Sequence, residues 1–325
     1  MQELYRSKIE PYLGYHGTGE APADYDEYWA RAKAELAAAS LEYELEETSF
    51  KAKSCEAWNL YFTGVGGARV HCQFLKPRNV SGKMPAIVLF HGYWSNSGDW
   101  SQKLRYVAEG FCVLAMDVRG QGGESSDCGV YDRGNTQSGH IIRGLECENP
   151  DKMFYRNVFL DAGQCARILM NMEFVDETNV FACGGSQGGA LTLACASLNP
   201  NLKGAVAIYP YLCDFQGVYK RGLEGSGFEE LTWYFRQRDP MHRKEEFFFN
   251  RLGYIDTKNR VRDIQCDILW MIGLSDPICP PYAQMAAYNN LTCPKQMICF
   301  PEYGHEGLLY GDDEIQAYLM RRLAE

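Results

Sequence analysis

The chain has 325 residues, of which 46% are hydrophobic and 23% are charged, a composition typical of a globular protein with a large buried core. Its net charge of −10 and the absence of any run of basic residues argue against a nucleic acid partner and against an anionic membrane surface. No apolar segment has the length of a membrane span and the first eight residues contain no apolar signal core, which predicts a cytoplasmic protein or a mature chain whose signal has been removed.

The amino-terminal part of the chain is predicted to contain one helix followed by antiparallel strands. Residues 22–39 have the pattern of an amphipathic helix, because Pro22 lies at the start, acidic residues fall in the first turn and alanines fill the end. Residues 41–76 alternate between apolar and polar side chains and contain a glycine-rich turn at 63–67, which is typical of a β-hairpin.

From residue 85 onward, continuous apolar strands alternate with helices. Strands are predicted over 85–90, 110–117, 179–183, 202–210, 267–273 and 295–300, and helices over 157–172, 281–290 and 312–323. This alternation predicts an α/β fold in one domain over residues 1–325, with a mostly parallel central sheet covered by helices on both faces. Ligands of such sheets bind beyond the carboxyl ends of the strands.

Two segments depart from this alternation and are predicted to be insertions. Residues 122–156 are polar and rich in loop-forming residues, whereas residues 211–262 are aromatic and charged. Insertions at the carboxyl edge of a sheet usually shape the access of a substrate or contact another subunit. For the aromatic residues of the second segment, which include Trp233 and Phe235, additional hydrophobic core is an equally open interpretation.

The segment Gly-Gly-Ser-Gln-Gly at residues 184–188 carries the strongest chemical signal in the chain. It has the pattern Gly-x-Ser-x-Gly and lies between an apolar strand and the start of a helix, which is the arrangement of a nucleophile elbow centred on Ser186. Glycine at the two flanking positions removes side-chain atoms that would clash in so tight a turn. A glycine-rich turn in an ordinary strand–helix unit is the alternative interpretation.

A serine nucleophile requires a base and an acid, and in this type of fold both follow it in the chain. Two histidines follow Ser186: His242 lies inside the second insertion, whereas His305 follows the last predicted strand and is the expected base. Asp276 directly follows the next-to-last strand and is the expected acid. Asp214, which follows an earlier strand, is left as the alternative acid.

The backbone N–H groups of Tyr93 and Gln187 are the expected oxyanion-hole donors, because one follows the strand at 85–90 and the other follows the serine. His91 precedes the serine in the chain and is expected to be structural. Ester hydrolysis through an acyl-enzyme by these groups requires no metal and no cofactor.

Three side chains are predicted to line the acyl site. Tyr93, Phe215 and Ile278 are expected to crowd the acyl group of the substrate.

The thirteen cysteines are odd in number, mostly lie in apolar contexts and include no set with the spacing of a zinc site. They are therefore predicted to be free thiols in a reducing compartment.

These motifs together resemble the acetyl xylan esterase and cephalosporin-C deacetylase family, which is carbohydrate esterase family seven. The matching motifs are Arg119-Gly120-Gln121-Gly122, Gly184-Gly185-Ser186-Gln187-Gly188 and His305-Glu306, with further matches at 25–29, 91–93, 276 and 278–281. They occur in the family's order over nearly the whole chain.

The resemblance implies an α/β-hydrolase that removes acetyl groups from small substrates, such as acetylated xylo-oligosaccharides and cephalosporin C. It assigns the nucleophile, acid, base and oxyanion donors to the residues named above, and a structural role to Arg119. It also implies a cytoplasmic homohexamer whose active sites face an internal cavity.

Two other classes of function stay open on the sequence alone. The same fold supports peptidases and acyltransferases, so the fold does not choose the reaction. A non-catalytic ligand-binding protein could keep the pocket, although it would have no need for the serine, acid and base that this chain retains.

Overall fold

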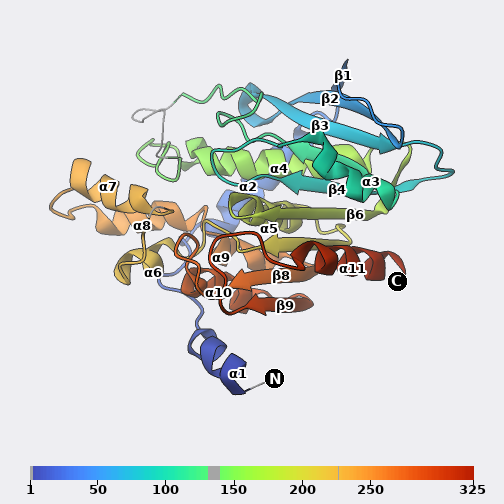
Figure 1. Cartoon of the computed structure of the whole chain (residues 1–325). Helices are drawn as coiled ribbons and strands as arrows, with labels where there is room; N and C mark the ends of the chain where they lie inside the picture. The colour runs from blue at the N-terminus through green and yellow to red at the C-terminus, as the bar shows by residue number, and fades with distance from the viewer. Residues whose placement is uncertain (1–2, 131–139, 226) are drawn as a thin grey trace.

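The computed structural model describes residues 3–130, 140–225 and 227–325, and its centre is a nine-stranded β-sheet (Figure 1). The strands are β1 (Glu44–Glu47), β2 (Cys55–Thr63), β3 (Arg69–Pro77), β4 (Met84–Phe90), β5 (Cys112–Met116), β6 (Val175–Gly185), β7 (Gly204–Ile208), β8 (Asp267–Gly273) and β9 (Lys295–Phe300). Their order across the sheet is β1-β2-β3-β5-β4-β6-β7-β8-β9. The first three strands pair antiparallel with their neighbours, and the strands from β4 to β9 are mutually parallel.

Helices cover both faces of this sheet, which confirms the predicted α/β architecture (Figure 1). One face packs against α2 (Tyr25–Ala38), α4 (Phe154–Met170), α5 (Gln187–Leu198) and α10 (Pro281–Asn290), and the other against α3 (Leu104–Ala108) and α11 (Gly311–Leu323). Along β4, Ala86 and Val88 join the first core and Ile87 joins the second. Because successive side chains of a strand point to opposite faces, a strand buried on both faces is apolar at nearly every position.

The second insertion folds into short helices that the sequence analysis did not predict: α6 (Phe215–Lys220), α7 (Glu229–Gln237), α8 (Glu245–Gly253) and α9 (Thr257–Arg260). Figure 1 shows α6, α7 and α8 beyond the carboxyl ends of the parallel strands. The ring centroids of Tyr234 and Phe248 are 4.2 Å apart, those of Phe235 and Phe248 are 4.9 Å apart, and all three side chains are buried. The aromatic residues therefore build an additional hydrophobic core under these helices.

The first insertion has little regular structure. Before α4 begins it contains a short 3-10 helix (Pro150–Lys152) within turns and bends, as its loop-rich composition predicts. Residues 131–139 of this insertion, and residue 226 of the second, lie outside the described part of the chain. The helix α1 (Glu3–Ile9) at the amino terminus is a further element that the sequence analysis did not predict.

The thirteen cysteines are all free thiols, and ten of them are buried, as expected for cysteines in apolar strands and helices. None of the helices in the described ranges combines the length and the apolar character that a membrane crossing requires.

Candidate active site

The serine of the glycine-rich motif lies in a strained turn between β6 and α5. Ser186 has φ 59° and ψ −122°, a conformation that L-residues rarely adopt. Its N–H donates to the carbonyl of Ile208 at 2.9 Å, and its carbonyl accepts from the N–H of Tyr211 at 3.0 Å. The end of the neighbouring strand β7 therefore fixes the turn from both sides.

Two glycines make this turn sterically possible. A Cβ atom on Gly184 would lie 2.5 Å from the carbonyl oxygen of Gly188, and one on Gly188 would lie 2.1 Å from the carbonyl oxygen of Phe90. Both distances are far below van der Waals contact, so any side chain would push β6, α5 and β4 apart. The motif thus has the geometry of a nucleophile elbow rather than that of an ordinary glycine turn.

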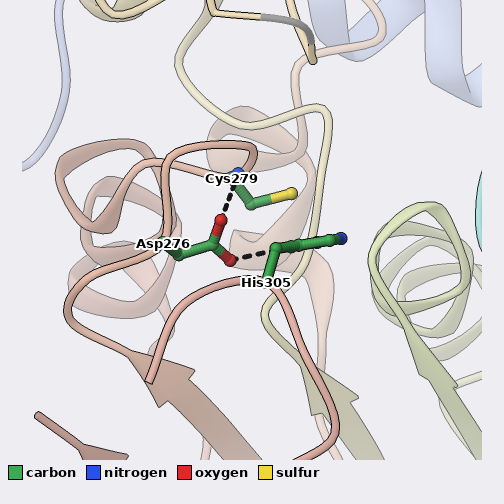
Figure 2. A group of neighbouring side chains, drawn as sticks. All are labelled: Asp276, Cys279 and His305. Carbon is green, nitrogen blue, oxygen red and sulfur yellow. Dashed lines mark hydrogen bonds and ion pairs between the residues drawn. The ribbon is translucent and has the colours of Figure 1, made fainter. Parts of the chain in front are cut away.

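Asp276 and His305 form a hydrogen-bonded pair on the loops that follow β8 and β9. The Nδ1 atom of His305 lies 2.8 Å from Oδ2 of Asp276, and Oδ1 accepts from the N–H groups of Ile278 and Cys279, each at 2.8 Å. The carboxylate is fully buried, whereas the His305 side chain is 22% exposed. Because Nδ1 donates to the carboxylate, Nε2 has a free lone pair, and Figure 2 shows it directed away from Asp276.

Two side chains connect this pair with the elbow. The ring of Tyr209 lies 4.7 Å from the ring of His305, and a Cβ atom on Gly185 would lie 3.3 Å from the Tyr209 ring. The Cys279 thiol is within hydrogen-bonding reach of the Ser186 side chain. Within the described chain, the Ser186 hydroxyl has no direct hydrogen bond to His305; such bonds are often long in unliganded enzymes and shorten in the substrate complex.

The two expected oxyanion donors flank the serine. Gln187 is the first residue of α5, where a backbone N–H has no acceptor within the helix. The loop that carries Tyr93 passes the serine closely, because a Cβ atom on Gly92 would lie 3.9 Å from that of Ser186. Among the described residues, the Tyr93 N–H donates to no backbone carbonyl. Both N–H groups are thus available to a ligand.

Gln121 connects the segments that carry Tyr93 and Gln187, a contact that the sequence analysis did not predict. Its Nε2 donates to Oε1 of Gln187 at 2.7 Å, and its Oε1 accepts from Nε2 of Gln187 at 3.0 Å and from the N–H of Trp94 at 3.2 Å. The hydroxyl of Tyr155 also donates to Oε1 of Gln187, at 2.9 Å. The motif that begins at Arg119 was the available signal, although nothing local in it shows which distant side chain Gln121 meets.

The hydroxyl of Tyr93 contacts one residue in each of the two insertions. It lies 2.8 Å from Nδ1 of His140 in the first insertion and donates to Oε1 of Glu230 in the second at 3.0 Å. Burial and the nearby Glu230 carboxylate raise the pKa of Tyr93, so the phenol stays neutral. Burial, together with the charge of Arg143, lowers the pKa of His140 to about 4, so this histidine is neutral at pH 7.

His91 has a position that fits a structural role. Its Nε2 accepts from the N–H of Val118 at 2.9 Å and its Nδ1 lies 2.7 Å from the carbonyl of Gly92, so both ring nitrogens are occupied. Burial lowers the pKa of His91 and keeps the ring neutral. The ring joins the ends of β4 and β5 and leaves no nitrogen free for proton transfer.

The alternative residues lie elsewhere. Asp214 accepts from the hydroxyl of Tyr15 at 2.6 Å and from the N–H of Thr18 at 2.8 Å, so its carboxylate holds the amino-terminal segment. Burial and the nearby Asp256 raise the pKa of Asp214. The ring of His242 is exposed on the surface of the second insertion and stacks on Phe235 with centroids 4.1 Å apart. The carboxylate beside His305 is that of Asp276.

The residues expected to line the acyl site are not equally accessible. Tyr93 and Ile278 are half-buried. Phe215 is 1% exposed, and its ring packs against that of Phe228, which in turn contacts Tyr211. Tyr211 in turn contacts Tyr93, with ring centroids 6.0 Å apart.

The strand order and the strand–serine–helix turn define an α/β-hydrolase. The solved acylaminoacyl peptidase of Pyrococcus horikoshii has the same fold, with a TM-score of 0.59 and 16% identity over 84% of this chain and 42% of that chain. At such low identity the likeness concerns the fold alone. Residues 6–322 match the family model of acetyl xylan esterases (AXE1), and the chain therefore belongs to the acetyl xylan esterase family.

Solved structures of two acetyl xylan esterases are similar over nearly their whole length. Acetyl xylan esterase 1 from Thermoanaerobacterium sp. JW/SL YS485 is 47% identical with a TM-score of 0.93, and the match covers 97% of this chain and 98% of that chain. The acetyl xylan esterase from Paenibacillus sp. R4 is 30% identical with a TM-score of 0.90, covering 98% and 99%. The family and the fold implied by the sequence motifs are thus confirmed.

A curated relative is longer than this chain. The acetyl esterase Axe7A of Xylanibacter ruminicola is 26% identical over 292 residues, which is 87% of this chain. The chain spans 63% of the length of that relative.

Proposed function

We propose that the chain is a serine esterase that removes acetyl groups from small acetylated substrates through an acyl-enzyme intermediate. The observation that carries the proposal is a serine at a strained elbow, joined through Tyr209 and Cys279 to a histidine that a buried carboxylate orients. A protein that only binds a ligand gives no reason for backbone strain at a serine beside such a pair.

In the proposed mechanism, Nε2 of His305 accepts the hydroxyl proton of Ser186 while the serine oxygen attacks the acetyl carbonyl carbon. Asp276 stays ionised and stabilises the imidazolium through its hydrogen bond to Nδ1. The imidazolium then gives its proton to the oxygen of the departing alcohol, which leaves acetyl-Ser186. A water molecule that His305 deprotonates attacks this ester, and acetate and the free serine hydroxyl are formed.

The N–H groups of Tyr93 and Gln187 are proposed to bind the oxyanion that develops on the acetyl carbonyl. Each such donor typically contributes about 10²–10³ to the rate. The side-chain bonds between Gln121 and Gln187, and between Gln121 and the N–H of Trp94, support this role, because they hold the two donor segments at a fixed spacing.

Acetyl selectivity is proposed to depend on Tyr93, Ile278 and Phe215. Tyr93 and Ile278 are half-buried beside the elbow and the acid loop, where they can meet an acyl group directly. Phe215 lies in the core behind Phe228, so its effect on the acyl site would be transmitted through Phe228 and Tyr211.

The names of the similar proteins support acetylated xylo-oligosaccharides as a substrate class, and the motif resemblance extends this to cephalosporin C-like acetyl esters. A cytoplasmic location and a homohexamer are proposed on the same resemblance. Sedimentation of the purified protein as a single species of 36.9 kDa would contradict the oligomer.

The function is tested by initial rates with p-nitrophenyl acetate, butyrate and octanoate. We expect fast acetate turnover that declines with chain length, and a loss of at least about 10⁴-fold in Ser186→Ala. Ser275→Ala is the matched control, because this exposed serine adjoins Asp276 and its hydroxyl donates to the carbonyl of Pro301. It should keep its rate within a few-fold.

Absence of turnover, or turnover that Ser186→Ala leaves intact, would overturn the proposal. Faster cleavage of peptide amides than of acetyl esters would instead indicate a peptidase on the same fold.

A further inference from the structure

The thiol of Cys279 has no role in the proposed mechanism, although it lies beside the reacting groups. Cys279 is 1% exposed, and its thiol is within hydrogen-bonding reach of the Ser186 side chain. Donor atoms of Cys279, Asp276 and His305 all lie within 4.8 Å of one another. A sulfur, an imidazole nitrogen and a carboxylate oxygen thus lie close to one another (Figure 2).

Two of these groups present unused lone pairs to the same space. Figure 2 shows Sγ of Cys279 and Nε2 of His305 on the side away from Asp276. The carboxylate is already engaged with His305 and with the N–H groups of Ile278 and Cys279. Its negative charge would favour a cation without a direct bond to it.

We propose that Cys279 and His305 form a binding site for a thiophilic divalent cation, Zn²⁺ or Cd²⁺, and that its occupation inhibits the enzyme. Thiolate and imidazole are ligands that such cations prefer, whereas Mg²⁺ prefers oxygen. The cation would take the lone pair of Nε2 that His305 needs as a base. The inhibition rests on the proposed esterase function, but the binding does not.

The distances are compatible with one ion. Zn²⁺ binds sulfur at about 2.3 Å and imidazole nitrogen at about 2.0 Å, so the two donors need to lie roughly 3.5 Å apart. Sγ of Cys279 lies within 4.8 Å of a ring nitrogen of His305, so rotation of the two side chains has to supply the remaining approach of Sγ to Nε2. The Ser186 hydroxyl and water are available as further ligands, and the 22% exposure of His305 gives the ion a way in.

Binding requires that the thiol lose its proton, which passes to the solvent as the metal–sulfur bond forms. Cd²⁺ is the softer of the two cations and prefers sulfur more strongly, so it should bind more tightly than Zn²⁺.

Other thiols do not share this environment. In residues 3–130, 140–225 and 227–325, no other group of three His, Cys, Asp or Glu residues brings its donor atoms so close together. Cys128 is the exposed cysteine and donates to the carbonyl of Gly66, so it serves as a matched control for adventitious binding of metal to a thiol.

The test combines metal binding with inhibition. The chelator-free wild-type protein is titrated with CdCl₂ by calorimetry and by ultraviolet absorbance of the cadmium–thiolate bond, and acetate release is then measured with Cd²⁺, Zn²⁺ and Mg²⁺. We expect saturable inhibition by Cd²⁺ and Zn²⁺ that EDTA reverses, and none by Mg²⁺. Cys279→Ala should weaken binding and inhibition by about 10- to 100-fold relative to its own uninhibited rate, whereas Cys128→Ala should behave as the wild type.

Inhibition of Cys279→Ala at the same metal concentration that inhibits the wild type would overturn the proposed metal site. Equal inhibition by Mg²⁺ would overturn it as well. If Cys279→Ala does not fold, Cys279→Ser keeps the size and a weak hydrogen-bonding group and must show the same loss of cadmium binding. If the wild type binds Cd²⁺ through Cys279 but hydrolyses no ester, the metal site stands and the proposed function fails.

Discussion

The described part of the chain contains two aspartate–histidine pairs of nearly equal length in two different settings. In the first, Nδ1 of His305 lies 2.8 Å from Asp276, and in the second Nδ1 of His71 lies 2.6 Å from Asp117. Both acids follow a strand of the parallel sheet. His305 comes from the loop after β9, whereas His71 lies inside β3, and its carbonyl accepts the N–H of Asp117 at 2.9 Å.

The two pairs differ in whether Nε2 of the histidine has a hydrogen-bond partner. The side chains of His71 and Asp117 are 4% and 3% exposed, and Nε2 of His71 is paired with the side chain of Asn59 at 3.1 Å. Asp117 also accepts from the N–H groups of Ser97 and Glu124, at 2.6 and 2.9 Å. A pair with every lone pair engaged holds segments together, whereas a pair with one free nitrogen beside a serine can move a proton.

The largest expected effect is on kcat, and it should differ between substitution of Asp276 and substitution of Asp117. Asp276→Asn should lower kcat by roughly 10⁴-fold, because an amide donates where the carboxylate accepts and so favours the wrong tautomer of His305. Asp117→Asn should change kcat by less than about 10-fold, because its partner does not touch the reacting groups. Steady-state kinetics with p-nitrophenyl acetate measure both, and equal losses would break the distinction.

A second expected effect concerns the contribution of Asp117 to the free energy of unfolding. Burial acts to raise the pKa of Asp117, but hydrogen bonds from His71, Glu124 and Ser97 outweigh it and lower the pKa to about 2. A carboxyl group with a lowered pKa stabilises the fold above its unfolded pKa of about 3.9, and this contribution is lost as the pH falls through 2. Asp117→Asn should thus lower the free energy of unfolding by about 2 kcal/mol at pH 7.

Urea unfolding of the wild type and Asp117→Asn between pH 7 and pH 2 measures this difference. The difference should be constant down to about pH 5 and largely lost by about pH 2. A difference that persists unchanged at pH 2 would show that the charge of Asp117 is not what stabilises the pair.

The smallest expected effect concerns the aromatic ring beside each histidine. Tyr209 lies 4.7 Å from the ring of His305, and Tyr61 lies 5.0 Å from the ring of His71. Such contacts are worth about 0.5–1.5 kcal/mol, so Tyr209→Leu should lower kcat by about 2- to 10-fold at unchanged KM, through a less well-oriented base. Tyr209→Phe keeps the ring and should restore the rate.

Tyr61→Leu is the matched control and should lower stability while leaving kcat unchanged. A rise in KM without a fall in kcat in Tyr209→Leu would assign Tyr209 to substrate binding instead of to the orientation of His305.

Much of the fold follows from the sequence because its signals are local. The apolar strands at 85–90 and 267–273 alternate with amphipathic helices, and their parallel pairing follows from the length of the connections. The helices of the second insertion were missed, because they are short and their apolar face consists mainly of aromatic residues that are equally common in strands.

The sequence by itself determined the elbow at Ser186 and the chain positions of Asp276 and His305, since turn chemistry and chain order are properties of the linear chain. Only the tertiary structure decided that His305 meets Asp276 while Asp214 holds the amino-terminal segment, and that Gln121 bridges Gln187 and the loop after β4. It also brought the Cys279 thiol against the serine and buried Phe215 behind Phe228. Side chains of residues tens of positions apart meet through the packing of loops, and no local pattern encodes that packing.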